Sequence, residues 1–273
     1  MRVLDLFSGI GGFSLGLERA GMRTVAFCEI EQFACRVLAK HWPGVPIAGD
    51  VRDREFIRGE ADIIVGGFPC QDVSLAGKRA GVAGGRSGLY REVLRAIRLV
   101  RPKFAVMENV AALLGFGMGV VLGDVAEDGL DAEWDCLSAG ELGAPHGRDR
   151  VWITLADSDQ LQRSQRRAKG AGWWLWRPEE IEATRDANGD WQLEPPRLLG
   201  DIRRRADDAA RCGTWWADNW QEKFEALRGM DDGVPTRLDR SAIASGIKTL
   251  GNAVVPQIPQ IIGEAIMAFE NIN

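Results

Sequence analysis

One cysteine in this sequence is well placed for covalent chemistry. Cys70 comes directly after Pro69, at the end of an apolar run that begins at Asp62. Proline restricts the backbone before the thiol, and a thiol is a strong nucleophile once it is ionised. A free cysteine more often serves as a small buried hydrophobe, which is our interpretation of three others, Cys28, Cys35 and Cys136. Cys70 is therefore the candidate nucleophile.

The segment that follows Cys70 combines glycine with positive charge. Residues 71–88 contain five glycines together with Lys78, Arg79 and Arg86. A segment of this length and composition favours a lid that closes over an anion, with a solvated surface loop as the alternative.

Polar groups also follow two later strands. Glu108 comes after a strand predicted at Lys103–Met107, where its carboxyl could donate a proton beside the thiol. Arg148 and Arg150 lie at alternate positions of an extended segment, so their side chains point the same way. They suit an acceptor oxygen and a phosphate. The alternatives are a carboxylate exposed to water and a salt-bridged edge strand.

A glycine turn near the start of the chain predicts a nucleotide-like site. Gly9 and Gly11 stand between a short apolar strand and a helix, where backbone N–H groups can approach a ligand. Glu29 lies 20 residues after Gly9. In nucleotide-binding sheets this is about the offset at which an acidic side chain accepts hydrogen bonds from ribose hydroxyls. Asp50 ends the next strand and could meet an adenine amino group. The alternative is a tight turn with two solvated carboxylates.

The elements that position these groups alternate between strand and helix. Strands are predicted at 2–7, 24–28, 46–48, 62–65, 103–107, 133–138 and 151–155, and helices at 13–20, 31–41 and 89–100. This alternation predicts an α/β fold with a mostly parallel sheet covered on both faces. Ligands in such folds bind at the carboxyl ends of the strands, where the residues above lie.

Composition divides the chain into three parts. The net charge of the 273 residues is -5, which by itself argues against a protein that coats nucleic acid. Most of the 10 Trp and several Arg clusters fall in a charge-balanced middle region. We expect one folded unit at 1–156, a second, irregular unit at about 157–235 and a separate C-terminal segment at 236–273. With no apolar run long enough for a membrane span, no signal peptide and no metal-ligand spacing, we expect a cytoplasmic, metal-free protein with reduced thiols.

The residues singled out above, in this order, resemble the DNA (cytosine-5) methyltransferase family. The matching stretches are Asp5–Phe13, Gly67–Gln71, Glu108–Val110, Arg148–Val151 and Gly251–Val254. The resemblance covers about 1–156 and 245–270. It implies a Rossmann-like sheet of the S-adenosylmethionine-dependent methyltransferase type, with a small, irregular target-recognition domain. The catalytic and cofactor-binding domain would then be 1–156, the target-recognition region 157–235, and the segment 236–273 would return to the catalytic domain.

The resemblance also implies roles for individual residues. S-adenosylmethionine would lie over Phe7, Gly9 and Gly11, with Glu29 on the ribose and Asp50 on the adenine. The pocket would be completed by Ile30, Val51, Pro69, Leu89 and Asn252. The Cys70 thiolate would attack C6 of a flipped-out cytosine while Glu108 engages N3, Arg150 holds O2, and Arg148 supports the Cys70 loop or a phosphate. The residues expected to meet DNA are Gln71, Ser74, Lys78 and Arg79.

The implied partner is double-stranded DNA, bound by a monomer, with a cognate restriction endonuclease acting separately. Three alternatives use the same residues differently. The first is the same chemistry on tRNA, and the second is a catalytically silent relative that binds DNA. The third is an NAD-dependent oxidoreductase, which leaves Pro69-Cys70-Gln71 unexplained and lacks the third glycine of the dinucleotide motif, because Ser14 holds that position.

Overall fold

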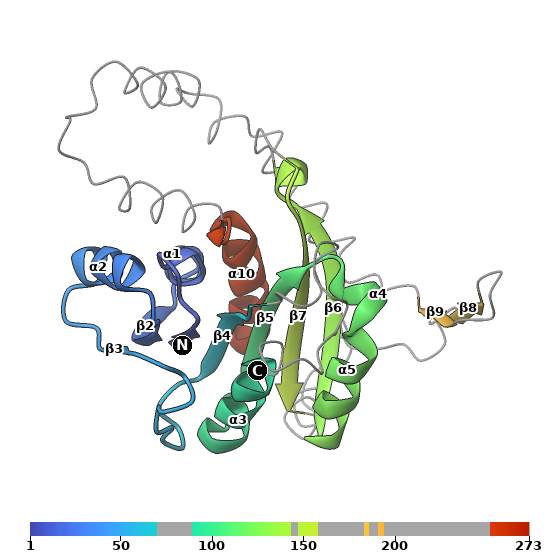
Figure 1. The fold of residues 1–273 in the computed structure, drawn as a ribbon, viewed down its shortest axis with the longest axis horizontal. Coiled ribbons are helices and arrows are strands. Elements are labelled where there is room, and N and C mark those ends of the chain that lie inside the picture. The colour runs from blue at the N-terminus through green and yellow to red at the C-terminus, as the bar shows by residue number, and fades with distance from the viewer. Residues whose placement is uncertain (70–88, 143–146, 158–182, 186–190, 194–251, 273) are drawn as a thin grey trace, which may run out of the picture.

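The centre of the molecule is a seven-stranded sheet in the order β3-β2-β1-β4-β5-β7-β6 (Figure 1). The structure is a computed structural model that describes residues 1–69, 89–142, 147–157, 183–185, 191–193 and 252–272. The strands of the sheet are β1 (Arg2–Leu6), β2 (Arg23–Cys28), β3 (Ile47–Ala48), β4 (Ile63–Gly67), β5 (Phe104–Val110), β6 (Leu130–Ser138) and β7 (Asp149–Asp157). The helices are α1 (Gly12–Arg19), α2 (Gln32–His41), α3 (Tyr90–Val100), α4 (Leu113–Phe116), α5 (Met118–Glu127), the 3-10 helix η3 (Ala139–Leu142) and α10 (Gln257–Ile272).

The sheet is parallel on one side and antiparallel on the other. Strands β3, β2, β1, β4 and β5 run parallel to one another, whereas β7 pairs antiparallel with both β5 and β6. Apart from β7, the order 3-2-1-4-5-6 is that of the doubly wound dinucleotide-binding sheet. The prediction of a Rossmann-like α/β fold is confirmed, and β7 is an antiparallel strand inserted before the edge.

Two apolar clusters cover the two faces of the sheet. One face packs against α3, α4 and α5 through buried residues such as Tyr90, Leu94 and Val121. The other face packs against α1 and α10 through Phe13, Leu17 and a row of isoleucines from α10 (Ile258, Ile261, Ile262 and Ile266). Helices therefore lie on both sides, as a parallel sheet with two apolar faces requires.

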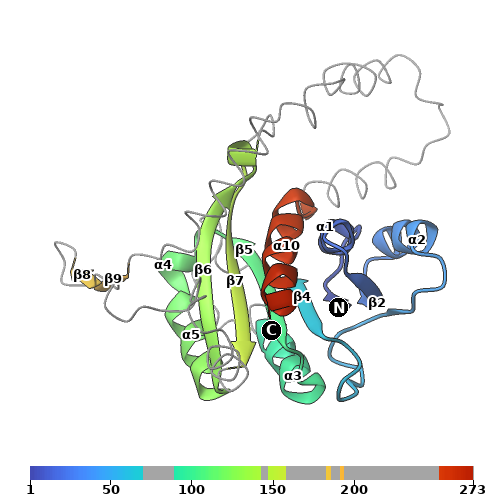
Figure 2. The ribbon, with the colours of Figure 1, turned by 180° about the vertical axis from the view of Figure 1, so that it is seen from behind.

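The end of the chain returns to its beginning. Helix α10 lies beside α1 in both views (Figures 1 and 2). The approach is close enough to need glycine: a Cβ on Gly12 would lie 2.4 Å from the carbonyl oxygen of Val254, and one on Gly16 would lie 2.2 Å from that of Pro256. The two glycines of α1 thus let residues 254–256 reach the base of the glycine turn.

Several predicted boundaries shift. The strand expected at 103–107 continues to Val110, so Glu108 and Asn109 lie within β5, side by side on opposite faces, and do not follow it. Helices α4, α5 and α10 were not predicted from the sequence. Within 157–235 the structure describes only two short strands, β8 (Ala183–Arg185) and β9 (Trp191–Leu193), which pair antiparallel. Among the described residues, no helix is both long and apolar enough to cross a membrane.

Candidate active site

The glycine turn after β1 is built from left-handed backbone. Phe7, Gly9 and Gly11 have φ angles of 54°, 54° and 87°. Such angles suit glycine but are uncommon for a bulky side chain, so Phe7 is held in a strained conformation at the carboxyl end of β1. The Glu29 carboxylate supports the turn, because its Oε2 accepts a hydrogen bond from the Gly9 N–H at 2.7 Å.

Gly11 faces away from the turn's open side. A Cβ on Gly11 would lie 2.6 Å from two ring carbons of Trp42, the residue that follows α2. The Trp42 indole N–H in turn donates to the Glu18 carboxylate of α1 at 2.9 Å. The turn is therefore packed from behind by an aromatic ring that is itself tied to α1.

Asp5 lies fully buried in β1. The Ser14 hydroxyl donates to its Oδ2 at 2.7 Å, whereas its Oδ1 has no hydrogen-bond partner. Burial raises the pKa of Asp5 to about 8, with the hydrogen bond from Ser14 acting in the opposite direction. The side chain is therefore mostly protonated at neutral pH, which explains how an unpartnered oxygen is tolerated there.

Asp50 follows the edge strand β3 and is paired locally. Its carboxylate accepts hydrogen bonds from the backbone N–H and the guanidinium of Arg52. The bond from the Arg52 side chain is the main reason that the pKa of Asp50 is lowered to about 2. Asp50 is thus ionised, and Arg52 bonds to both of its carboxylate oxygens.

Glu108 of β5 and Arg150 of β7 form a largely buried ion pair. The Arg150 Nε lies 3.0 Å from the Glu108 Oε1. Burial raises the pKa of Glu108, although Arg150 and Arg148 both act to lower it. The loss of hydration outweighs the two cations, so this carboxyl is better able to hold a proton than an exposed glutamate.

Asn109, next to Glu108, faces the other side of β5 and holds the backbone that leads to Cys70. Its Nδ2 donates to the carbonyl of Phe68 at 3.0 Å, and its Oδ1 accepts from the N–H of Val110 at 2.8 Å. Asn109 is only 2% exposed. The last described residues before the nucleophile candidate are therefore fixed by a buried side chain.

These groups converge on one pocket of about 500 Å³ at the carboxyl ends of the parallel strands. Among the predicted site residues, those lining it are Phe7, Gly9, Glu29, Ile30, Asp50, Val51, Pro69, Leu89, Glu108, Arg148, Arg150 and Asn252. Gly11 is not among the lining residues and packs on Trp42 instead. Cys70, Gln71, Ser74, Lys78 and Arg79 lie outside the described residues.

Nine of the lining residues were not among the predicted site residues, and three of the nine carry ionisable side chains: Cys28, Glu31 and Arg52. Glu31 caps the start of α2, because its carboxylate accepts hydrogen bonds from the N–H groups of Phe33 and Ala34. An acidic residue just before a predicted helix is a sequence signal that could have identified it. Cys28 is buried, and burial raises the pKa of its thiol to about 11, so it stays a neutral lining group. Nothing in the local pattern distinguished Arg52 from other exposed arginines.

Charge is unevenly distributed along the pocket. The carboxylates of Glu29, Glu31 and Asp50 gather at the end formed by β2 and β3, while Arg148 and Arg150 stand near Glu108. The acidic end offers acceptors for hydroxyl, amino or cationic groups, and the basic end offers donors for carbonyl or phosphate oxygens. Within the described part of the chain, no group of three or more His, Cys, Asp or Glu side chains could hold a metal ion.

Comparison with known proteins identifies the family. The profile of C-5 cytosine-specific DNA methylases matches residues 1–208. The chain belongs to this family. Among curated methylases, the type II methyltransferase M2.BsuMI of Bacillus subtilis is 39% identical over 165 residues, which is 57% of this chain and 42% of that protein. M.Eco47II of Escherichia coli is 36% identical over 165 residues, which is 58% of this chain and 40% of that protein.

The match therefore spans less than half the length of these two methylases. A solved structure, the Dnmt2 methyltransferase of S. pombe, superposes over 100% of this chain and 99% of its own, with a TM-score of 0.55 and 17% identity. That likeness concerns the fold alone.

Proposed function

We propose that this methylase-family chain transfers a methyl group from S-adenosylmethionine to C5 of cytosine in duplex DNA. The observation that carries the proposal is the pocket itself. It joins an acidic end at Glu29 and Asp50 to the Glu108–Arg150 pair, beside Pro69 and hence next in sequence to Cys70. One cavity thus offers groups for an adenosine-type cofactor and groups for a polar base.

The residues at the acidic end fit this cofactor by their chemistry. Glu29 accepts N–H bonds from Gly9 and Glu31, at 2.7 Å each, with one bond to each carboxylate oxygen. Each oxygen keeps a second lone pair for a ribose hydroxyl. The turn at Gly9 has open space beside it, since a Cβ there would meet nothing within 4 Å. S-adenosylmethionine supplies the methyl group when bound.

The opposite end suits the cytosine ring. Glu108, kept protonated more readily by burial, donates to N3 and makes the ring electron-poor. The Arg150 guanidinium has five N–H donors. Its Nε contacts Glu108 and its NH1 donates to the Asp149 carbonyl, and the donors that remain serve O2 of the base. Flipping the base out of the duplex costs a few kcal/mol, which is about what such contacts can return.

Cys70 performs the covalent step in this proposal. Its thiolate would add to C6, so that the electron pair of the C5–C6 double bond becomes available at C5. C5 would take the methyl group as the methyl–sulfur bond breaks, and the donor would leave as S-adenosylhomocysteine. A base then removes the C5 proton, the double bond re-forms and the thiolate leaves. Arg148 supports the Cys70 loop or a phosphate, while Gln71, Ser74, Lys78 and Arg79 contact the DNA. In this proposal the methylase acts as a monomer, and its cognate restriction endonuclease acts separately.

Trapping the covalent adduct tests the proposal directly. The protein is incubated with S-adenosylmethionine and duplex DNA containing 5-fluorocytosine, from which fluorine cannot be eliminated. We expect a band stable to denaturation for the wild-type protein and no band for Cys70→Ala. A parallel reaction on tRNA separates the RNA-directed alternative. Bisulfite sequencing of methylated DNA then gives the recognition sequence, and the absence of any adduct or methylation on either nucleic acid would refute the proposed chemistry.

A further inference from the structure

The segment between β3 and β4 carries part of the cofactor pocket without regular secondary structure of its own. Residues 49–60 form turns and irregular backbone, and they follow an edge strand of two residues. Asp50 and Val51, both lining the pocket, lie at the start of this segment. No strand or helix holds Asp50, and the backbone bond that it accepts is local, from the N–H of Asp53 at 3.1 Å. Its position relative to the rest of the pocket therefore depends on side-chain contacts.

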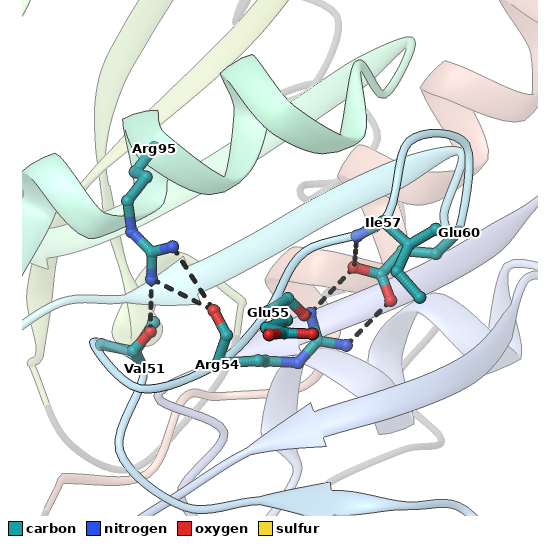
Figure 3. Close-up of polar contacts among 6 residues, drawn as sticks. All are labelled: Val51, Arg54, Glu55, Ile57, Glu60 and Arg95. Carbon is teal, nitrogen blue, oxygen red and sulfur yellow. Dashed lines mark hydrogen bonds and ion pairs between the residues drawn. The ribbon is translucent and has the colours of Figure 1, made fainter.

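Arg95 of α3 supplies such a contact. Its NH2 donates to the carbonyl oxygen of Val51 at 2.7 Å, and both terminal nitrogens lie 3.4 Å from the carbonyl oxygen of Arg54. Figure 3 shows the side chain reaching from α3 to these two carbonyls. The guanidinium is itself oriented by Glu92, one turn earlier on the same helix, whose carboxylate accepts from the Arg95 Nε at 2.6 Å.

A second set of contacts closes the segment around the same point. The Arg54 guanidinium pairs with both oxygens of Glu60, at 2.8 and 3.0 Å, and Glu60 also accepts from the N–H of Ile57 (Figure 3). The Phe56 ring contacts two cations, with the guanidinium carbons of Arg54 and Arg95 at 4.8 and 4.7 Å from its centroid. Side-chain contacts thus join separate parts of the segment to one another, and Arg95 joins the segment to α3.

Arg95 therefore links two walls of one pocket. Leu89, which lines the pocket, immediately precedes α3, and Val51 lines it from the β3 side. Arg95, Arg54 and Phe56 are not among the described residues that line the pocket. Arg95 can influence a ligand only through the backbone that it holds.

We propose that Arg95 is a positioning residue for the adenosine end of the pocket, where it fixes the Val51 carbonyl and so the backbone that carries Asp50. This inference rests on the proposed function, since it assumes that the acidic end receives S-adenosylmethionine. A charged hydrogen bond to a buried carbonyl is among the stronger side-chain contacts, and its loss leaves Val51 only the N–H of Arg54, at 3.4 Å.

The test compares cofactor affinity in three variants of the full chain. Arg95→Met removes the bond to Val51 and keeps the length of the side chain. Arg95→Lys keeps the charge and one donor but loses the fork. Arg98→Met is the matched control, because Arg98 lies one turn further on α3 and pairs with Asp128 at 3.2 Å, away from the segment. The dissociation constant of S-adenosylmethionine is measured by calorimetry, with the thermal midpoint of each variant alongside.

We expect Arg95→Met to raise that dissociation constant about tenfold, Arg95→Lys to raise it by less, and Arg98→Met to leave it unchanged. In steady-state assays the KM for the cofactor should rise while kcat stays within about twofold, since Arg95 does not touch the base. Faster hydrogen exchange at amides 50–54 in Arg95→Met would support the same reading.

Other outcomes overturn the inference. An unchanged dissociation constant in Arg95→Met, or an equal loss in Arg98→Met, would show that Arg95 only stabilises the fold. If Arg95→Met does not fold, Arg95→Lys decides: weaker binding at an unchanged thermal midpoint supports the inference, and unchanged binding refutes it. A wild-type chain that binds no S-adenosylmethionine would refute the proposed function as well, which distinguishes the two failures.

Discussion

The Arg150 Nε lies 3.0 Å from the Glu108 Oε1, yet the pKa of Glu108 is raised. An ion pair alone would lower the pKa of a carboxyl, so burial dominates at this position. The Glu108 carboxylate also lies close to Gly67 of β4, because a Cβ on Gly67 would be 2.9 Å from the Glu108 Oε2. A proton on Glu108 at neutral pH is what the proposed contact with cytosine N3 requires.

Replacing Glu108 with glutamine should slow methyl transfer by about 10²- to 10⁴-fold, the range for loss of a positioned general acid. The amide fills the same volume and can still donate a hydrogen bond, but it cannot give up a proton. Single-turnover transfer to duplex DNA measures the effect. The matched control is Glu133→Gln, because Glu133 is another buried carboxyl, with its pKa raised by burial to about 8, that does not line the pocket. Equal rates in Glu108→Gln and wild type would remove Glu108 as the acid.

Asn109→Ala should reduce kcat about 5- to 100-fold while leaving the dissociation constant of S-adenosylmethionine nearly unchanged. The variant removes the donor to the Phe68 carbonyl and leaves that buried oxygen unpaired, at a cost of about 1–3 kcal/mol. Part of this cost appears as misplacement of the segment that leads into Cys70. The yield of the 5-fluorocytosine adduct per unit time reports that placement. A variant that loses cofactor affinity and keeps its adduct rate would contradict the assignment.

Gly11→Ala should destabilise the fold more than Gly44→Ala. The two glycines share nearly the same backbone, with φ of 87° and 86°, so an alanine at either position carries the same left-handed strain of about 1–2 kcal/mol. A Cβ at Gly44 meets nothing within 4 Å, whereas one at Gly11 would overlap the Trp42 ring at 2.6 Å. We expect overpacking to add about 1–3 kcal/mol at Gly11. Urea unfolding of both variants measures the difference, and equal losses would show that Trp42 moves aside freely.

Local patterns predicted the parts of the site that lie at strand ends. Gly9, Glu29 and Asp50 each follow a predicted strand, whereas Glu108 lies within β5, and the structure brings all four to one pocket. This succeeded because parallel strands end at the same edge of a sheet, so sequence position after a strand is already a spatial statement.

Pairing between residues far apart in the sequence was harder to predict. Strand β5 extends to Val110 because that residue pairs with Arg150 across β7, a contact between segments 40 residues apart that no local periodicity contains. Likewise, the Asp50–Arg52 pair and the Arg95 bond to Val51 depend on loop geometry. Helix α10 is a different case, because its buried Ile258, Ile262 and Phe269 recur at helical spacing, and that signal was available in the sequence.

The buried carboxyl of Asp5 predicts how stability depends on pH. Its pKa in the folded chain is about 8, against an ordinary value of 3.8. Between these pH values the folded chain keeps a proton that the unfolded chain has released. The stabilisation associated with that proton is therefore complete below about pH 4 and is lost as pH rises towards 8, by up to about 1.4 kcal/mol per pH unit.

Asp5→Asn removes the titration and keeps an amide oxygen that can accept from the Ser14 hydroxyl, now 2.7 Å from the Asp5 Oδ2. We expect the free energy of unfolding of wild type minus that of Asp5→Asn to fall steadily between about pH 5 and 8 and then to level off. Urea unfolding at half-unit intervals from pH 5 to 9 measures this difference. Other groups with shifted pKa values, such as Glu133, are present in both proteins and cancel. A difference that stays constant over this range would mean that Asp5 is ionised in the folded chain, despite its burial beneath the glycine turn.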